Sequence, residues 1–138
     1  MSYSGLDFYK KVIHSYTMNL DIGRITSLPF YPALVKFIEG ATRLNAEYWT
    51  RTKLTYNTPP VVQIVSMGKR YAKLAKMERR PFLTGPLSAG SVYCFVDLTN
   101  GDLLKGTWKA PVANGVRGNL SDPNVLSKFT DHGPAYLR

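Results

Sequence analysis

The sequence predicts an α+β fold, in which a helical N-terminal part is followed by a β-hairpin and an irregular basic loop and tail. Two observations indicate this class. Apolar residues recur at intervals of three and four before residue 80, the period of amphipathic helices. After residue 90, β-branched and aromatic runs flank Asn100-Gly101, a strong signal for a hairpin. A chain of 138 residues fits a single domain (residues 1–138), mainly helical over 1–80, with the hairpin and tail over 91–138.

The first of about three expected helices lies near the N-terminus. Ser4 stands where a capping residue would be, and the helix should end before Asn19. Its apolar stripe consists of Leu6, Tyr9, Ile13 and Tyr16. Residues 20–31 contain glycine, proline and polar residues, so we expect a loop there.

A second helix is expected over residues 32–54. Pro32 suits its first turn, because the missing N–H of proline costs nothing there. The helical period continues through Leu34, Phe37, Ile38, Ala41, Leu44 and Tyr48. Prolines at positions 59 and 60 push the residues before them out of the α region and should end it.

The third expected helix covers residues 60–79 and pairs with the second as an antiparallel helical hairpin. One face carries the apolar residues Ile64, Met67, Tyr71, Leu74 and Ala75. The opposite face carries Lys69, Lys73, Lys76 and Arg80, spaced four, three and four, with Arg70 between the two faces. Gly68 should weaken this helix by about 1 kcal/mol.

The last third of the chain is expected to be extended. After a proline- and glycine-bearing connector over residues 80–90, strands are predicted over residues 92–98 and 103–108. A basic, glycine-bearing loop follows over residues 109–119, and a short helix over residues 122–129 with Pro123 in its first turn. The remaining tail is expected to be irregular.

Composition and charge exclude several classes of protein. An apolar content of 44% with 6 Phe, 9 Tyr and 2 Trp can build a core, so disorder is not expected. Cys94 is the only cysteine, which excludes an intrachain disulfide and suggests a buried, inert thiol. No apolar run approaches the roughly 18 residues of a membrane span. We therefore expect a soluble, intracellular domain without a membrane partner.

The net charge of +9 is concentrated in one segment. Residues 61–90 carry six bases and the single acid Glu78, a balance of +5. A solvated helix usually interleaves acids with its bases, so this segment favours an anionic partner over a merely solvated face. Nucleic acid fits such a face, because each base can neutralise a phosphate. A second group of candidates lies near the basic loop, where Trp108 could stack on a base. The candidate nucleic-acid-binding residues are Lys69, Arg70, Lys73, Lys76, Arg79, Arg80, Lys105, Trp108, Lys109 and Arg117.

Other chemistry finds little support in the residues. Tyr93 and Phe95 are spaced like the aromatic residues of an RNA-recognition strand, but the flanking residues differ and packing within the hairpin explains them better. Asp97 and Asp102 are interpreted as turn residues; a nuclease would need them as a metal-binding pair. No catalytic set, metal set or cofactor motif is recognisable, so we expect neither an enzyme nor a cofactor.

Residues 91–138 resemble small, mostly uncharacterised bacteriophage proteins. The resemblance rests on Gly101-Asp102-Leu103-Leu104-Lys105, Trp108-Lys109-Ala110-Pro111, Arg117-Gly118-Asn119-Leu120 and a closing Tyr136-Leu137-Arg138. It implies a viral source and a location in the host cytoplasm or the virion.

The leading hypothesis is therefore a phage accessory protein that binds DNA or RNA with little sequence preference. One alternative is a virion structural or assembly protein whose basic face meets an acidic partner. Another is a host-takeover inhibitor that mimics or blocks a nucleic-acid site. The pattern does not define the oligomeric state.

Overall fold

The protein is mostly β, with one long helix. The computed structural model describes residues 20–52, 59–78 and 88–135. Its helices are α2 (Ile22–Thr26), α3 (Tyr31–Arg51) and the 3-10 helix η1 (Val125–Lys128). Its strands are β1 (Val61–Met67), β2 (Tyr71–Glu78), β3 (Ser88–Asp97), β4 (Asp102–Gly106), β5 (Pro111–Asn119), β6 (Phe129–Thr130) and β7 (Gly133–Pro134). The prediction of three helices followed by a single hairpin is wrong.

The expected second helix is present as α3. Pro32 lies in its first turn, and Thr52 caps its other end by donating a hydrogen bond from Oγ1 to the Tyr48 carbonyl at 3.0 Å. Most of the predicted apolar stripe is buried, and Asn45 is buried beside it. The Asn45 amide stays satisfied, because its Nδ2 donates to the Ala41 carbonyl at 2.8 Å. The expected loop before α3 contains the short helix α2, which Asp21 caps by accepting from the Arg24 N–H.

The predicted third helix does not exist, so the predicted helical hairpin does not exist either. Residues 61–78 form the antiparallel hairpin β1–β2 instead, with Gly68, Lys69 and Arg70 in its turn. The start of this segment is rich in β-branched Val and Ile, which fit a pleated sheet better than a helix. Gly68 therefore serves a turn and does not interrupt a helix.

The expected hairpin after residue 90 is confirmed as β3–β4. Gly101 adopts a φ of +81° in its turn and donates its N–H to the Asp97 carbonyl at 2.8 Å. The predicted basic loop, however, is the strand β5, which pairs with β4. The predicted short helix is only the single turn η1, followed by the small strand pair β6–β7.

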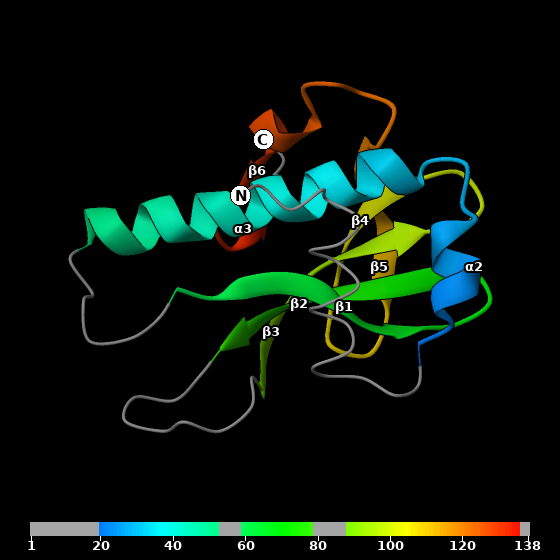
Figure 1. Cartoon of the computed structure of the whole chain (residues 1–138), viewed down its shortest axis with the longest axis horizontal. Coiled ribbons are helices and arrows are strands. Elements are labelled where there is room, and N and C mark those ends of the chain that lie inside the picture. The colour runs from blue at the N-terminus through cyan, green and yellow to red at the C-terminus, as the bar shows by residue number, and fades with distance from the viewer. Residues whose placement is uncertain (1–19, 53–58, 79–87, 136–138) are drawn as a thin grey trace.

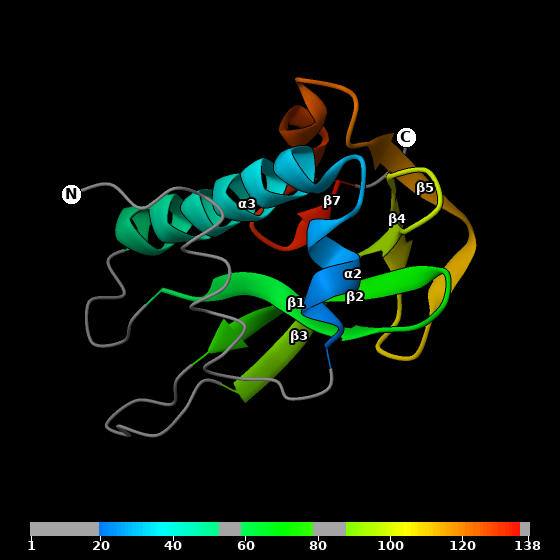
Figure 2. The same cartoon turned by 45° about the vertical axis from the view of Figure 1, so that its right-hand side comes forward.

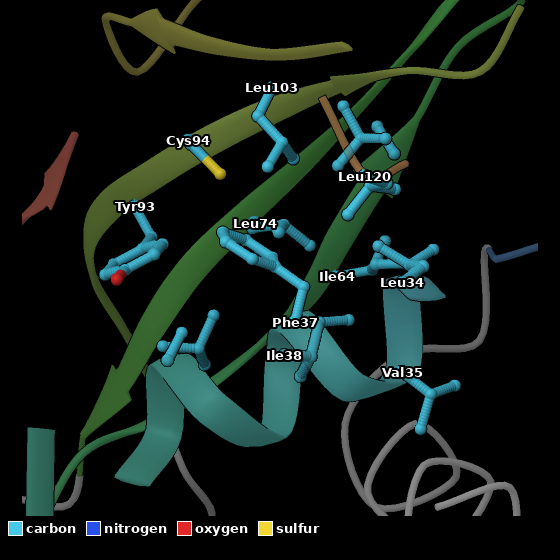
Figure 3. Close-up of a cluster of buried hydrophobic side chains, with 14 of the residues drawn as sticks. Leu34, Val35, Phe37, Ile38, Ile64, Leu74, Tyr93, Cys94, Leu103 and Leu120 are labelled. Carbon is cyan, nitrogen blue, oxygen red and sulfur yellow. The ribbon is translucent and has the colours of Figure 1, made fainter. Parts of the chain in front are cut away.

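The five large strands form one antiparallel sheet whose spatial order is the order of the chain, β1-β2-β3-β4-β5. Helix α3 lies across one face of this sheet, and α2 lies beside the β1–β2 end (Figures 1 and 2). The core fills the space between α3 and the sheet, where Leu34, Phe37 and Ile38 of α3 meet strand side chains (Figure 3). Cys94 lies in this core with no exposed surface, and burial raises the pKa of its thiol far above the ordinary value.

Several expectations concern residues outside the described ranges. These are the first helix before Asn19, most of the connector over residues 80–90, Arg79, Arg80 and the last three residues of the tail.

Candidate nucleic-acid interface

The sheet has a second face, which points away from α3. Side chains alternate along each strand, so cross-strand partners share a face. Ala72, Val96 and Leu103 form a row in the core beneath α3. The neighbouring row runs across all five strands on the opposite face and consists of Ser66, Lys73, Phe95, Leu104 and Val116.

A close approach brings the β4–β5 turn against this second face. A Cβ added to Gly106 would lie 2.4 Å from a ring carbon of Phe95, so only glycine fits there without a shift. The Phe95 ring is buried although it points away from the core. In both views the gold β4–β5 turn lies below the sheet, on the side away from α3 (Figures 1 and 2).

Hydrogen bonds define the shape of the β4–β5 turn. The Thr107 N–H donates to the Ala110 carbonyl at 2.9 Å, and Thr107 Oγ1 accepts from the N–H groups of Lys109 and Ala110 at 3.3 and 3.4 Å. This turn presents Trp108, whose side chain is 48% exposed. The Lys73 ammonium nitrogen lies 4.2 Å from the centre of the indole ring, within the range of a cation–π contact.

The β1–β2 turn lies at the other end of the same sheet and is also basic. Arg24 of α2 holds it by donating to the backbone carbonyls of Gly68, at 2.7 Å, and of Lys69. Arg70 donates from Nε to Asp97 Oδ2 at 3.1 Å and stacks over the Tyr71 ring at 5.1 Å. Arg24 had no signal in the sequence, because its role depends on a contact 44 residues along the chain.

Asp97 remains ionised although only 2% of its surface is exposed. Burial raises the pKa of its carboxyl group, but hydrogen bonds from the Thr99 hydroxyl and backbone N–H, and the hydrogen bond and charge of Arg70, outweigh that effect. The net pKa therefore lies below the ordinary value of 3.8. Its hydrogen-bond partners identify Asp97 as a turn residue, as the sequence suggested.

The structure describes eight of the ten predicted site residues and separates them into two groups. We use the name basic sheet surface for the set that follows the second face from one turn to the other: Lys69, Arg70, Lys73, Trp108 and Lys109. Lys73 lies between the two turns. Measured along the strand at ~3.3 Å per residue, it is about 10 Å from Arg70 and about 13 Å from Lys69. The basic sheet surface therefore extends along the sheet from one turn to the other.

The other three described candidates lie elsewhere. Lys76 pairs with Val62 on the face beneath α3 and is only 9% exposed, so the prediction that it shares a face with Lys69 and Lys73 is wrong. Lys105 lines a cleft on the α3 side. Arg117 in β5 donates from Nη1 to the carbonyls of Asn114 and Val116 at 3.0 and 3.2 Å.

Val116 is a residue of this face that the sequence did not single out. It is 49% exposed, similar to Trp108, and it lies in the same row as Lys73. The sequence predicted a loop at this position, so the face of the sheet that the Val116 side chain occupies could not be predicted.

Two classes of site find no support in the residues that the structure describes. Their His, Cys, Asp and Glu side chains form no group of three that could hold a metal ion. Their helices include none with the length and apolar character needed to cross a bilayer.

The fold and the surface define a basic, mostly β protein in which one long helix covers one face of a five-stranded meander. A family of unknown function, DUF7717, matches residues 9–133, and the chain belongs to this family. No curated protein and no solved structure matches the chain.

Proposed function

We propose that the protein binds single-stranded nucleic acid, DNA or RNA, with little sequence preference through the basic sheet surface. The observation that carries this proposal is the half-exposed Trp108 ring with the Lys73 ammonium 4.2 Å from its centre. An indole that is fixed on a turn and open to solvent can stack on a base. Stacking of this kind tolerates every base, because each one has a π-face.

The bases of the basic sheet surface supply the electrostatic part of the binding. Lys69 and Lys109 are exposed at opposite ends, and Lys73 lies between them. Phosphates on either side of a stacked base would meet these ammonium groups. Arg70 contributes less, because Asp97 already neutralises part of its charge.

Fluorescence anisotropy with a labelled single strand of about 16 nucleotides tests the proposal. If Lys69, Lys73 and Lys109 each neutralise one phosphate, affinity should fall about 20-fold between about 50 and about 200 mM salt. Trp108→Ala should weaken binding about tenfold at fixed salt, because a base loses its stacking partner. Binding should also quench the Trp108 fluorescence.

A charge control separates this surface from general attraction. Lys36→Gln removes an exposed base from α3, on the other side of the sheet, and should leave the affinity nearly unchanged. Equal losses in Lys36→Gln and Lys73→Gln would contradict the proposed surface. A duplex bound as tightly as the single strand, with no effect of Trp108→Ala, would exclude stacking.

The resemblance of residues 91–138 to bacteriophage proteins supports a role as a phage accessory protein in the host cytoplasm or the virion. Mass spectrometry of purified particles tests the location. A fixed copy number per particle identifies a virion component, whereas absence from particles and presence in infected cells identifies an intracellular binder.

A further inference from the structure

A cleft lies on the α3 side of the sheet, away from the row of the second face that carries Lys73. It has a volume of about 740 Å³, within the usual range of about 300–1,000 Å³ for small-molecule sites. Its walls come from four segments that are distant in the sequence: the C-terminal half of α3, β3, the end of β4, and residues 130–135. Such convergence is typical of a binding cleft.

The wall formed by residues 130–135 is fixed against β3. Gly133 has a φ of +114°, and an added Cβ would lie 2.4 Å from the Tyr93 carbonyl oxygen. The Tyr93 hydroxyl donates to the Thr130 carbonyl at 2.7 Å. The cleft therefore exists before any ligand arrives, which lowers the entropy lost on binding.

One polar group in the cleft contacts two neighbouring side chains. The His132 imidazole Nε2 lies 3.2 Å from Asp131 Oδ2, and its ring meets the Tyr48 ring edge-on at 5.8 Å between centres. The Asp131 side chain is 13% exposed and that of His132 is 72% exposed. A nearly buried carboxylate thus lies beside an imidazole that still faces the open cleft.

The end of β4 contributes a lysine to the cleft. Lys105 projects from β4 into the lining of the same cleft. A cleft lined by an imidazole and an ammonium group offers hydrogen-bond donors to an anion with several oxygens, such as a phosphate group. The same cleft is also lined by Val92, Pro134 and the Tyr48 ring, which can contact a planar apolar group.

We propose that this cleft binds an aromatic phosphomonoester of nucleotide size. Its phosphate lies between Lys105 and His132, and its planar ring packs against Tyr48. This site is independent of the basic sheet surface, so either proposal can fail without the other.

Isothermal titration calorimetry on the whole chain tests this site with adenosine 5′-monophosphate as the probe, and with adenosine and inorganic phosphate as separate arms. The monophosphate should bind saturably, and each part alone should bind at least about tenfold more weakly, because each makes only part of the contacts. Equal binding of phosphate and the monophosphate would refute the aromatic part of the proposal. No binding of any of the three would refute the site.

Two variants locate the binding. His132→Gln and Lys105→Gln should each weaken binding of the monophosphate about tenfold, since each removes a charge-assisted hydrogen bond. Lys128→Gln, which removes a base on η1 that does not line the cleft, should leave it unchanged. His132 is exposed, so its variant should fold even if Lys105→Gln does not.

Trp108→Ala distinguishes this site from the proposed strand-binding surface. It should weaken single-strand binding and leave monophosphate binding unchanged. Loss of monophosphate binding in Trp108→Ala, or its retention in both cleft variants, would overturn the assignment.

Discussion

At the scale of single residues, Asp97 shows how a buried charge can stabilise the sheet. Its carboxylate accepts from the Thr99 N–H at 2.9 Å, the Thr99 hydroxyl at 2.6 Å and Arg70 Nε at 3.1 Å. These contacts tie the β3–β4 turn to the β1–β2 turn. The same group would cost energy if it were buried without these partners.

Asp97→Asn should lower the free energy of unfolding at pH 7 by about 2 kcal/mol, since hydrogen bonds to a charged group are lost. The folded pKa of Asp97 lies below its ordinary value of 3.8, so the stabilisation is fully present above that value and is lost as the pH falls through the folded pKa. The difference between the two proteins should therefore shrink on acidification below about pH 4. Urea denaturation at several pH values measures it.

A matched carboxylate provides the control. Asp122→Asn removes a solvent-exposed pair with Lys128 at 3.6 Å and should change the free energy of unfolding by less than about 1 kcal/mol. If both variants lose the same amount at every pH, the network around Asp97 does not stabilise the fold as argued.

At the scale of elements, the small pair β6–β7 has a role larger than its length. It follows η1, and its Phe129 ring packs edge-on against Phe37 of α3 with 4.9 Å between centres. Gly133 allows it to approach β3 closely enough to form one wall of the cleft. Two short strands thus connect the helix, the sheet and the proposed nucleotide site.

Gly133→Ala should destabilise the protein by more than about 1 kcal/mol, because the φ is unfavourable for alanine and its Cβ would collide with the Tyr93 carbonyl. Gly68→Ala is the matched control, since the nearest atom to its added Cβ would be the Tyr71 carbonyl oxygen at 3.9 Å, an ordinary contact. That variant should leave stability within about 0.5 kcal/mol. Thermal and urea unfolding compare the two; similar losses would show that the close approach is unimportant.

At the scale of the whole molecule, the sheet divides the bases of β2 between two environments. Lys73 lies on the face away from α3, beside Trp108, and Lys76 lies on the face beneath α3. They are three residues apart, so a helix would place them together and a strand places them on opposite sides. The proposed function uses Lys73, the base that lies beside Trp108 on the face away from α3.

Lys73→Gln should weaken single-strand binding and reduce the slope of log affinity against log salt by about 0.7, the loss of one phosphate contact. Lys76→Gln should leave that slope unchanged, because Lys76 is only 9% exposed. Anisotropy titrations at several salt concentrations measure both slopes. A reduced slope in Lys76→Gln with an unchanged one in Lys73→Gln would reverse the assignment of the two faces.

The sequence predicted α3 well and the β1–β2 hairpin badly, for physical reasons. A proline in the first turn, Pro32, and an apolar stripe along one side predict a helix that is buried on one face only. The segment with Val62, Gln63 and Ile64 is buried on both faces, so the alternation of a strand is hidden and a helical period can be fitted to it.

Strand β5 illustrates a second limit. Its Asn114, Gly115 and Gly118 have low strand propensity, and it forms because β4 offers a partner edge. The hairpin β3–β4 could be predicted because the residues of its turn are by themselves a signal for a hairpin. Candidate residues such as Trp108 could be chosen by type, but their grouping depends on pairings between distant segments.

The order of the strands has a consequence for synthesis of the chain. Each strand pairs with its neighbour in sequence, so the sheet can form one hairpin at a time with short loop closures. The helix α3 emerges from the ribosome before any strand, and its apolar stripe has no sheet to cover until the strands follow. Phe37 meets Phe129 only when almost the entire described chain has been made. Nascent chains that stop short of residue 129 therefore expose part of the helix stripe, which makes them natural clients of chaperones.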